Sequence, residues 1–110
     1  MDGSVPGSRE EVASNSIPDI AVIVVNWNRR ELLRCCLESL TRQQDADFEV
    51  IVVDNGSADG SPEMAMEEFS GRLRLRLIRN AVNRGFCAAN NQGFAATGAQ
   101  FVALLNNDAE

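Results

Sequence analysis

A chain of 110 residues has room for one domain with a core of ordinary size. With 45% hydrophobic and 24% charged residues it has the composition of a soluble globular protein, and no apolar run reaches the roughly 20 residues that cross a bilayer. The net charge of −6, with no lysine, argues against nucleic-acid binding through a basic face.

The N-terminal stretch and the cysteines indicate where the protein resides rather than what it does. Residues 1–18 are polar, lack the apolar core of a signal peptide, and are expected to form a flexible lead-in. The three cysteines are an odd number, and their spacing fits neither a disulfide framework nor a CxxC metal site. We expect Cys35, Cys36 and Cys87 to be small buried hydrophobic side chains in a reducing compartment, which indicates a cytoplasmic protein.

Four stretches are expected to be β-strands. Residues 20–25 and 48–53 are nearly unbroken aliphatic runs, as in central parallel strands that are covered on both faces. Leucine alternates with arginine over residues 73–79, which indicates a strand at the edge of the sheet with one face in solvent. Residues 101–105 are again apolar, and we expect them to form a buried fourth strand.

Helices are expected between these strands. The first follows Asn28, which begins an Asn-led variant of the capping box with Glu31, and its apolar residues recur at helical spacing. The second has Ser61 as its cap, ahead of a proline, and continues through residues 64–69; the third spans residues 86–96. This alternation with short links predicts right-handed crossovers and a mainly parallel, four-stranded, Rossmann-like α/β sheet.

Polar residues follow all four predicted strands. In parallel sheets ligands bind outside the carboxyl ends of the strands, so these residues are expected to meet at one rim. Any one of them alone is also explained as a turn or a cap, since Asn, Asp, Gly and Ser are the common turn residues. Together they predict a binding site made of four stretches: Asn26-Trp27-Asn28, residues 54–61, residues 80–85, and Asn106-Asn107-Asp108.

The chemistry of these residues suits a nucleotide. Asp54 and Asn55 offer acceptors for the N3 hydrogen of a pyrimidine, and Gly56 allows close approach of the backbone. Trp27, the only tryptophan, suits either an aromatic platform for a base or packing at the end of the sheet.

Two of these stretches, residues 80–85 and 106–108, offer charged groups that suit a diphosphate. Asp108, directly after an apolar strand, is placed to hold a divalent cation that bridges to a diphosphate; its alternative role is a strand-end turn. Arg84 either neutralises phosphate charge or is a solvated surface residue. The motifs GxGxxG and GxxxxGK[ST] are absent from the sequence, which argues against a dinucleotide oxidoreductase and a P-loop NTPase.

Four motifs that span residues 19–110 in order, VIVVNWN, VIVVDNGSADGS, NRGFCAANNQG and LLNNDAE, resemble those of glycosyltransferase family 2, which has the GT-A fold. Within that family the chain is most similar to rhamnosyltransferase-type members that build bacterial surface polysaccharides. In two places it departs from the usual pattern. The DxD motif is reduced to Asp108, and the second position of the usual Asp-Asp pair is Asn55.

The resemblance implies roles for individual residues. Trp27 stacks on or borders the pyrimidine, Asp54 and Asn55 contact base and ribose, the loop of residues 83–85 lies near the diphosphate, and Asp108 binds Mg²⁺ or Mn²⁺. The full set of expected donor contacts is Asn26, Trp27, Asn28, Asp54, Asn55, Ser57, Asn83, Arg84, Gly85 and Asn107.

The expected function is transfer of a sugar, with inversion, from a UDP- or dTDP-sugar to a hydroxyl of a glycan or lipid-linked acceptor. Residues 19–110 correspond to the donor-binding half of the GT-A domain, so we expect the general base and the acceptor site to be missing and the chain alone to be inactive and prone to self-association. The location expected for the full protein is cytoplasmic, or peripheral at the inner face of the membrane.

The alternative function is that of a non-enzymatic nucleotide-binding or structural α/β module. A sugar-nucleotide pyrophosphorylase would carry a Gly-rich loop with Arg and Lys where this chain has Asn26-Trp27-Asn28.

Overall fold

The computed structural model describes residues 18–43 and 47–106, so most of the expected lead-in lies outside it. Strands and helices alternate as the sequence predicts. None of the helices in these two ranges is long and apolar enough to cross a membrane. In chain order the elements are β1 (Ile20–Asn26), α2 (Arg30–Thr41), β2 (Phe48–Asp54), α3 (Ser61–Phe69), β3 (Leu75–Arg79), α4 (Phe86–Ala96) and β4 (Phe101–Asn106).

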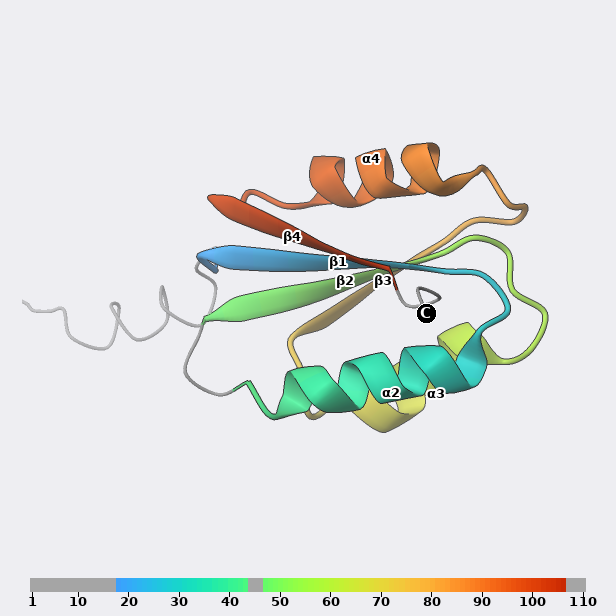
Figure 1. Ribbon diagram of the computed structural model, residues 1–110, viewed down its shortest axis with the longest axis horizontal. Helices are drawn as coiled ribbons and strands as arrows, with labels where there is room; N and C mark the ends of the chain where they lie inside the picture. Colours follow the sequence, from blue (N-terminus) through green and yellow to red (C-terminus); the bar gives the residue numbers. More distant parts are fainter. Residues whose placement is uncertain (1–17, 44–46, 107–110) are drawn as a thin grey trace, which may run out of the picture.

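The four strands form one parallel sheet in the order β3-β2-β1-β4. Helices α2 and α3 cover one face of the sheet and α4 covers the other (Figure 1). The chain moves outward from β1 to β2 and β3, and then returns through α4 to place β4 on the other side of β1. The direction of winding therefore reverses between β1 and β4, which is the arrangement that opens a ligand crevice in α/β sheets. The expected Rossmann-like class is confirmed, with β3 at an edge.

The core consists of two layers that share the central strands. Because successive side chains of a strand point to opposite faces, an unbroken aliphatic run supplies both layers at once. This explains why β1 and β2 carry no alternating polar residues over most of their length. The layer under α2 and α3 contains Val22, Val24, Leu33, Leu37, Val50, Val52, Met64, Ala65 and Phe69. The layer under α4 contains Ala21, Ile23, Val25, Ile51, Val53 and Ala89.

The expectation that β4 is buried is wrong. Phe101 is 62% exposed and Leu104 is 47% exposed, and only Val102 packs against a core layer. The cause is position rather than composition, because β4 pairs with β1 alone among the described strands. Helix α4 packs mainly on β1 and β2. This apolar edge is the surface on which the predicted self-association depends.

Two of the predicted helix caps are also wrong. Asn28 and Ser61 were expected to cap α2 and α3, but the Asp59 side chain caps both helices. Helix α2 begins after Arg29 and α3 begins after Gly60, and neither has a cap from its own N-cap side chain. The Asp59 carboxylate instead accepts hydrogen bonds from the Arg30 N–H of α2, at 3.0 Å, and from the Ser61 N–H of α3, at 3.0 Å. One carboxylate therefore joins the N-termini of two helices, where the helix dipole favours a negative charge.

Replacing Asp59 with alanine is expected to lower the free energy of unfolding at pH 7 by about 2 kcal/mol, the combined cost of two lost caps. Burial would raise the pKa of Asp59, but hydrogen bonds from Ser61 and Arg30 outweigh it and lower the pKa. A carboxylate with a lowered folded-state pKa stabilises the protein above its ordinary pKa of about 4, and this contribution is lost as the pH falls through the folded-state value. Urea unfolding of wild type and Asp59→Ala should therefore differ most near pH 7, and the difference should shrink as the pH falls through the lowered pKa of Asp59. A difference that persists at low pH would contradict the role of the charged form.

The cysteines are not the buried side chains that we expected. All three are free thiols, with Cys35 and Cys87 exposed and Cys36 partly buried. Cys35 lies on the solvent side of α2, whose buried side is formed by Leu33 and Leu37. Burial raises the pKa of the Cys36 thiol, and the neighbouring Cys35 adds to this effect.

Candidate functional site

The carboxyl ends of β1 and β2 are tied together by buried polar side chains. Asn26 ends β1 and Asp54 ends β2, and each is 1% exposed. The two residues are register partners in the parallel pair, so their side chains leave the sheet on the same side. Asn26 Nδ2 donates to Asp54 Oδ1 at 3.0 Å. Asn26 and Asp54 were expected to meet at the carboxyl ends of their strands, and the structure brings them together.

Ser57 extends this pair to the loops that follow the strands. Its N–H donates to Asp54 Oδ2 at 2.8 Å and its hydroxyl donates to Asp54 Oδ1 at 2.7 Å. The Ser57 hydroxyl also accepts a hydrogen bond from the Asn28 N–H at 2.8 Å. The side-chain oxygen of Asn28, Oδ1, accepts one from the Ala58 N–H at 2.7 Å. Asn28 has a positive φ of 52°, a conformation that asparagine tolerates better than most residues. The β1 and β2 loops therefore form one hydrogen-bonded unit around the Asp54 carboxylate.

Asn55 makes the corresponding connection to the loop between β3 and α4. Its side chain is 2% exposed. Asn55 Nδ2 donates to the Gly85 carbonyl oxygen at 3.1 Å, and Asn55 Oδ1 accepts from the Arg84 N–H at 3.1 Å. The loop is further closed by Asn83 Oδ1, which accepts from the Gly85 N–H at 2.7 Å. The structure thus places Asn55 beside the loop of residues 83–85, and it uses the Asn55 amide to hold that loop.

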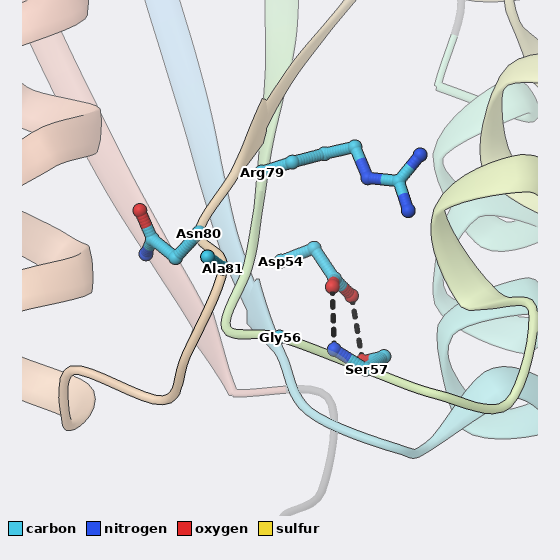
Figure 2. Close-up of a pocket in the computed structure, with 6 residues that line it drawn as sticks. All are labelled: Asp54, Gly56, Ser57, Arg79, Asn80 and Ala81. Carbon is cyan, nitrogen blue, oxygen red and sulfur yellow. Dashed lines mark hydrogen bonds between the residues drawn. The ribbon is translucent and has the colours of Figure 1, made fainter.

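A cavity of about 300 Å³ opens between the ends of β2 and β3, a volume at the lower end of the range for small-molecule sites. Figure 2 shows that the Arg79 side chain extends toward α3, on the same side of β3 as Asp54, whereas the Asn80 side chain points the opposite way, toward α4. The Arg79 guanidinium lies 3.1 Å from the Glu63 carboxylate and is half exposed. The cavity therefore offers a carboxylate and a guanidinium on one wall, and it is lined by Asp54, Gly56, Ser57, Arg79, Asn80 and Ala81.

Gly56 shapes the mouth of this cavity. Its φ of +89° is in the left-handed region, and a Cβ on it would lie 3.1 Å from the backbone of Val82. The β2 loop and the β3–α4 loop therefore approach each other more closely than a side chain at position 56 would permit. The close approach that the sequence predicted for a ligand is made by the protein's own backbone.

The remaining expected site residues lie further out. Trp27 is 51% exposed at the end of β1 and does not line the cavity. Arg84 is exposed, and its backbone rather than its guanidinium is fixed by the network. Asn107 and Asp108 lie outside the described residues. Within residues 18–43 and 47–106, no three His, Cys, Asp or Glu side chains come together in a way that could hold a metal ion.

The family model described as Glycosyl transferase family 2 matches residues 21–110. The chain belongs to this family. Among curated relatives, the succinoglycan biosynthesis protein ExoO of Rhizobium meliloti is 33% identical over 96 residues, which cover 87% of this chain and 27% of ExoO. The chain thus spans about a quarter of the length of this relative.

Solved structures of other proteins share the fold. The S. aureus protein TarS, in complex with UDP-GlcNAc, superimposes with a TM-score of 0.76 and 27% identity over 82% of this chain and 26% of TarS. The mannosyltransferase PcManGT from Pyrobaculum calidifontis, in complex with GDP-Man and Mn²⁺, gives a TM-score of 0.75 and 29% identity over 86% of this chain and 28% of PcManGT. The expected membership of glycosyltransferase family 2 and the expected GT-A-type fold are confirmed, while the rhamnosyltransferase subgroup stays a prediction.

Sequence reasoning missed Arg79 and Gln92 as members of the site, and it predicted no partner for Asn80. Asn80 and Gln92 exchange two side-chain hydrogen bonds, at 2.7 and 2.8 Å, across the gap between β3 and α4. A signal was present for Arg79, because it is the last residue of the predicted third strand and directly precedes Asn80. Gln92 gave none, since a glutamine in the middle of a helix is ordinarily a surface residue.

Proposed function

We propose that the rim formed by the β1, β2 and β3–α4 loops binds the nucleotide of a nucleotide-diphosphate sugar, and that the protein acts as an inverting glycosyltransferase. The donor in this proposal is a UDP- or dTDP-sugar, and the acceptor is a hydroxyl of a polysaccharide or glycolipid precursor. The observation that carries the proposal is the cavity beside Asp54, at the carboxyl ends of the parallel strands of a family 2 chain. Asp54 Oδ2 keeps a lone pair besides the one that accepts the Ser57 N–H, and this acceptor suits the N3 hydrogen of a pyrimidine.

The relatives support this choice of ligand. TarS has been solved with UDP-GlcNAc, and PcManGT with GDP-Man and Mn²⁺, so nucleotide sugars with either kind of base occur among structures similar to this chain. The name of ExoO refers to succinoglycan biosynthesis, which supports a polysaccharide as the product. We also propose a cytoplasmic location, which three free thiols suit.

The proposal places a divalent metal, Mg²⁺ or Mn²⁺, at Asp108. Oxygen ligands such as carboxylates are those that Mg²⁺ and Mn²⁺ prefer. Among the described residues Asp54 lines the cavity, but no three His, Cys, Asp or Glu side chains come together there to hold a metal ion. A bound cation would offset the charge of the departing diphosphate on a chain whose own net charge is −6.

Calorimetric titration with UDP, dTDP and GDP, each with and without Mn²⁺, tests the proposal directly. We expect the purified chain to bind UDP or dTDP in the presence of Mn²⁺, and Asp108→Ala to lose at least about tenfold in affinity, since a removed metal ligand typically costs that much or more. Asp47→Ala is the matched control, because Asp47 is an exposed aspartate next to β2 at the opposite end of the sheet. Equal affinities for Asp108→Ala and wild type in Mn²⁺ would refute the metal role, and a preference for GDP would refute the pyrimidine.

A further inference from the structure

We propose that Gln92, Asn80 and Asn55 form a relay of amide side chains that positions the loop of residues 81–85 for nucleotide binding. In this arrangement Gln92, on α4 and outside the cavity, sets nucleotide affinity without touching the ligand. The inference rests on the proposed function, because it assigns the positioned loop to the donor nucleotide. It gives Asn55 the role of holding the loop, where the family resemblance implies a contact with base and ribose.

The relay begins with a reciprocal pair on α4 and at the end of β3. Asn80 Nδ2 donates to Gln92 Oε1 at 2.7 Å, and Gln92 Nε2 donates to Asn80 Oδ1 at 2.8 Å. Two amides that exchange both hydrogen bonds fix each other's orientation, so neither can rotate without breaking the pair. Asn80 is buried and Gln92 is half-buried. The pair therefore locks the orientation of the Asn80 side chain.

The second hydrogen of Asn80 Nδ2 carries the relay to β2. It is donated to Asn55 Oδ1 at 3.0 Å, and the same oxygen accepts the Arg84 N–H at 3.1 Å. With Asn55 Nδ2 directed at the Gly85 carbonyl oxygen, at 3.1 Å, both ends of the Asn55 amide hold the loop. The contacts thus run from α4 through the ends of β3 and β2 to the backbone of two successive loop residues.

The loop has little else to fix it in place. Residues 81–88 are all exposed, so apolar packing contributes little to its position. The close approach of Val82 to Gly56 limits how far the loop can move inward, but does nothing to prevent it from moving away. Hydrogen bonds from a buried amide are then the main constraint on the loop, and each is costly to break because the Asn55 amide is buried.

The relay also explains why this chain has asparagine at position 55, where the family frequently has aspartate. The side chain must accept one N–H and at the same time donate to a carbonyl oxygen. A carboxylate at Asn55 could still accept from Asn80 and Arg84, but it would face the Gly85 carbonyl oxygen with no hydrogen to donate. The amide is the side chain of this shape that satisfies all three partners.

The test uses the variants Gln92→Leu and Gln92→Glu, with Gln100→Ala as the control. Leucine removes both hydrogen bonds to Asn80, whereas glutamate keeps the acceptor and loses the donor. Gln100 is an exposed glutamine between α4 and β4, at the opposite end of the sheet. For each variant we would measure amide hydrogen exchange of Arg84 by NMR, the dissociation constants of UDP and dTDP by calorimetry with Mn²⁺, and the free energy of unfolding in urea.

We expect exchange of the Arg84 amide to accelerate about tenfold in Gln92→Leu, and the dissociation constant of the bound nucleotide to rise by about the same factor. Gln92→Glu should show a smaller change of the same sign, and Gln100→Ala none. Unchanged Arg84 exchange in both Gln92 variants would overturn the relay, whether or not the chain binds nucleotide. Faster exchange with unchanged affinity would overturn the positioning role. If wild type binds no nucleotide, faster exchange in Gln92→Leu would support the relay while the proposed function fails.

Discussion

Replacing Asp54 with alanine is expected to cause the largest loss of stability of any single change at the rim, about 3 to 5 kcal/mol in the free energy of unfolding. The carboxylate is almost completely buried and accepts hydrogen bonds from the Ser57 N–H, the Ser57 hydroxyl and Asn26 Nδ2. Its removal takes away the acceptor of the Ser57 N–H and hydroxyl and one of the acceptors of Asn26 Nδ2, and each buried donor left unpaired costs about 1 to 3 kcal/mol. A small domain has only about 5 to 15 kcal/mol in total, so urea unfolding would detect the loss easily.

The variant Asp54→Asn separates the carboxylate's roles. With its oxygen in the place of Oδ1 it still accepts from the Ser57 hydroxyl and Asn26 Nδ2, but its amide hydrogens then face the Ser57 N–H, so an intermediate loss of stability is expected. Asp47→Ala, a change at an exposed aspartate, should leave the unfolding midpoint unchanged. An Asp54→Ala protein as stable as wild type would mean that the β1 and β2 loops are held by something other than this carboxylate.

The sheet was predictable because its signal is local. The aliphatic runs that became β1 and β2 are long enough to cover both faces of a strand, and parallel pairing follows from the helices between them. The exposure of β4 was not predictable from its residues. A run such as Phe101 to Leu105 has the same composition whether or not a neighbouring strand lies beside it, and here β4 is paired on one side among the described residues.

Most residues of the rim were predicted from the sequence, but the hydrogen bonds that connect them were predicted only in part. The strand-end rule correctly put Asn26, Asp54 and Ser57 in one place, because register partners in parallel strands end at the same level. It could not show that Asp59 caps a helix that starts 29 positions earlier, nor that Gln92 reaches Asn80 from α4. Both contacts depend on how helices are seated on the sheet, and that seating is decided by packing between residues far apart in the sequence.

Gly93 allows α4 to pack closely on β1. Gly93→Val is the second change for which we expect a large loss of stability. A Cβ on Gly93 would lie 2.7 Å from Cγ2 and 2.9 Å from Cδ1 of Ile23, which is fully buried in the centre of β1. Neither group can move aside, since Ile23 sits in a closely packed layer and Gly93 in the middle of a helix. Overpacking of this kind costs about 1 to 3 kcal/mol for a small addition, and we expect about 3 kcal/mol for valine, measured by urea unfolding.

Two further variants establish the cause. Gly71→Val is the matched control, because a Cβ there meets nothing within 4 Å, and it should change stability by less than about 1 kcal/mol. Gly93→Ala combined with Ile23→Ala should cost less than the sum of the single changes, since the second substitution removes the atoms that the first one strikes. Strict additivity would show that Gly93 is required for another reason.

Because Gln92 is the neighbouring residue on α4, a helix lifted from β1 also draws Gln92 away from Asn80. In the amide relay proposed above, Gly93→Val should therefore speed exchange of the Arg84 amide, although it changes no group in the relay.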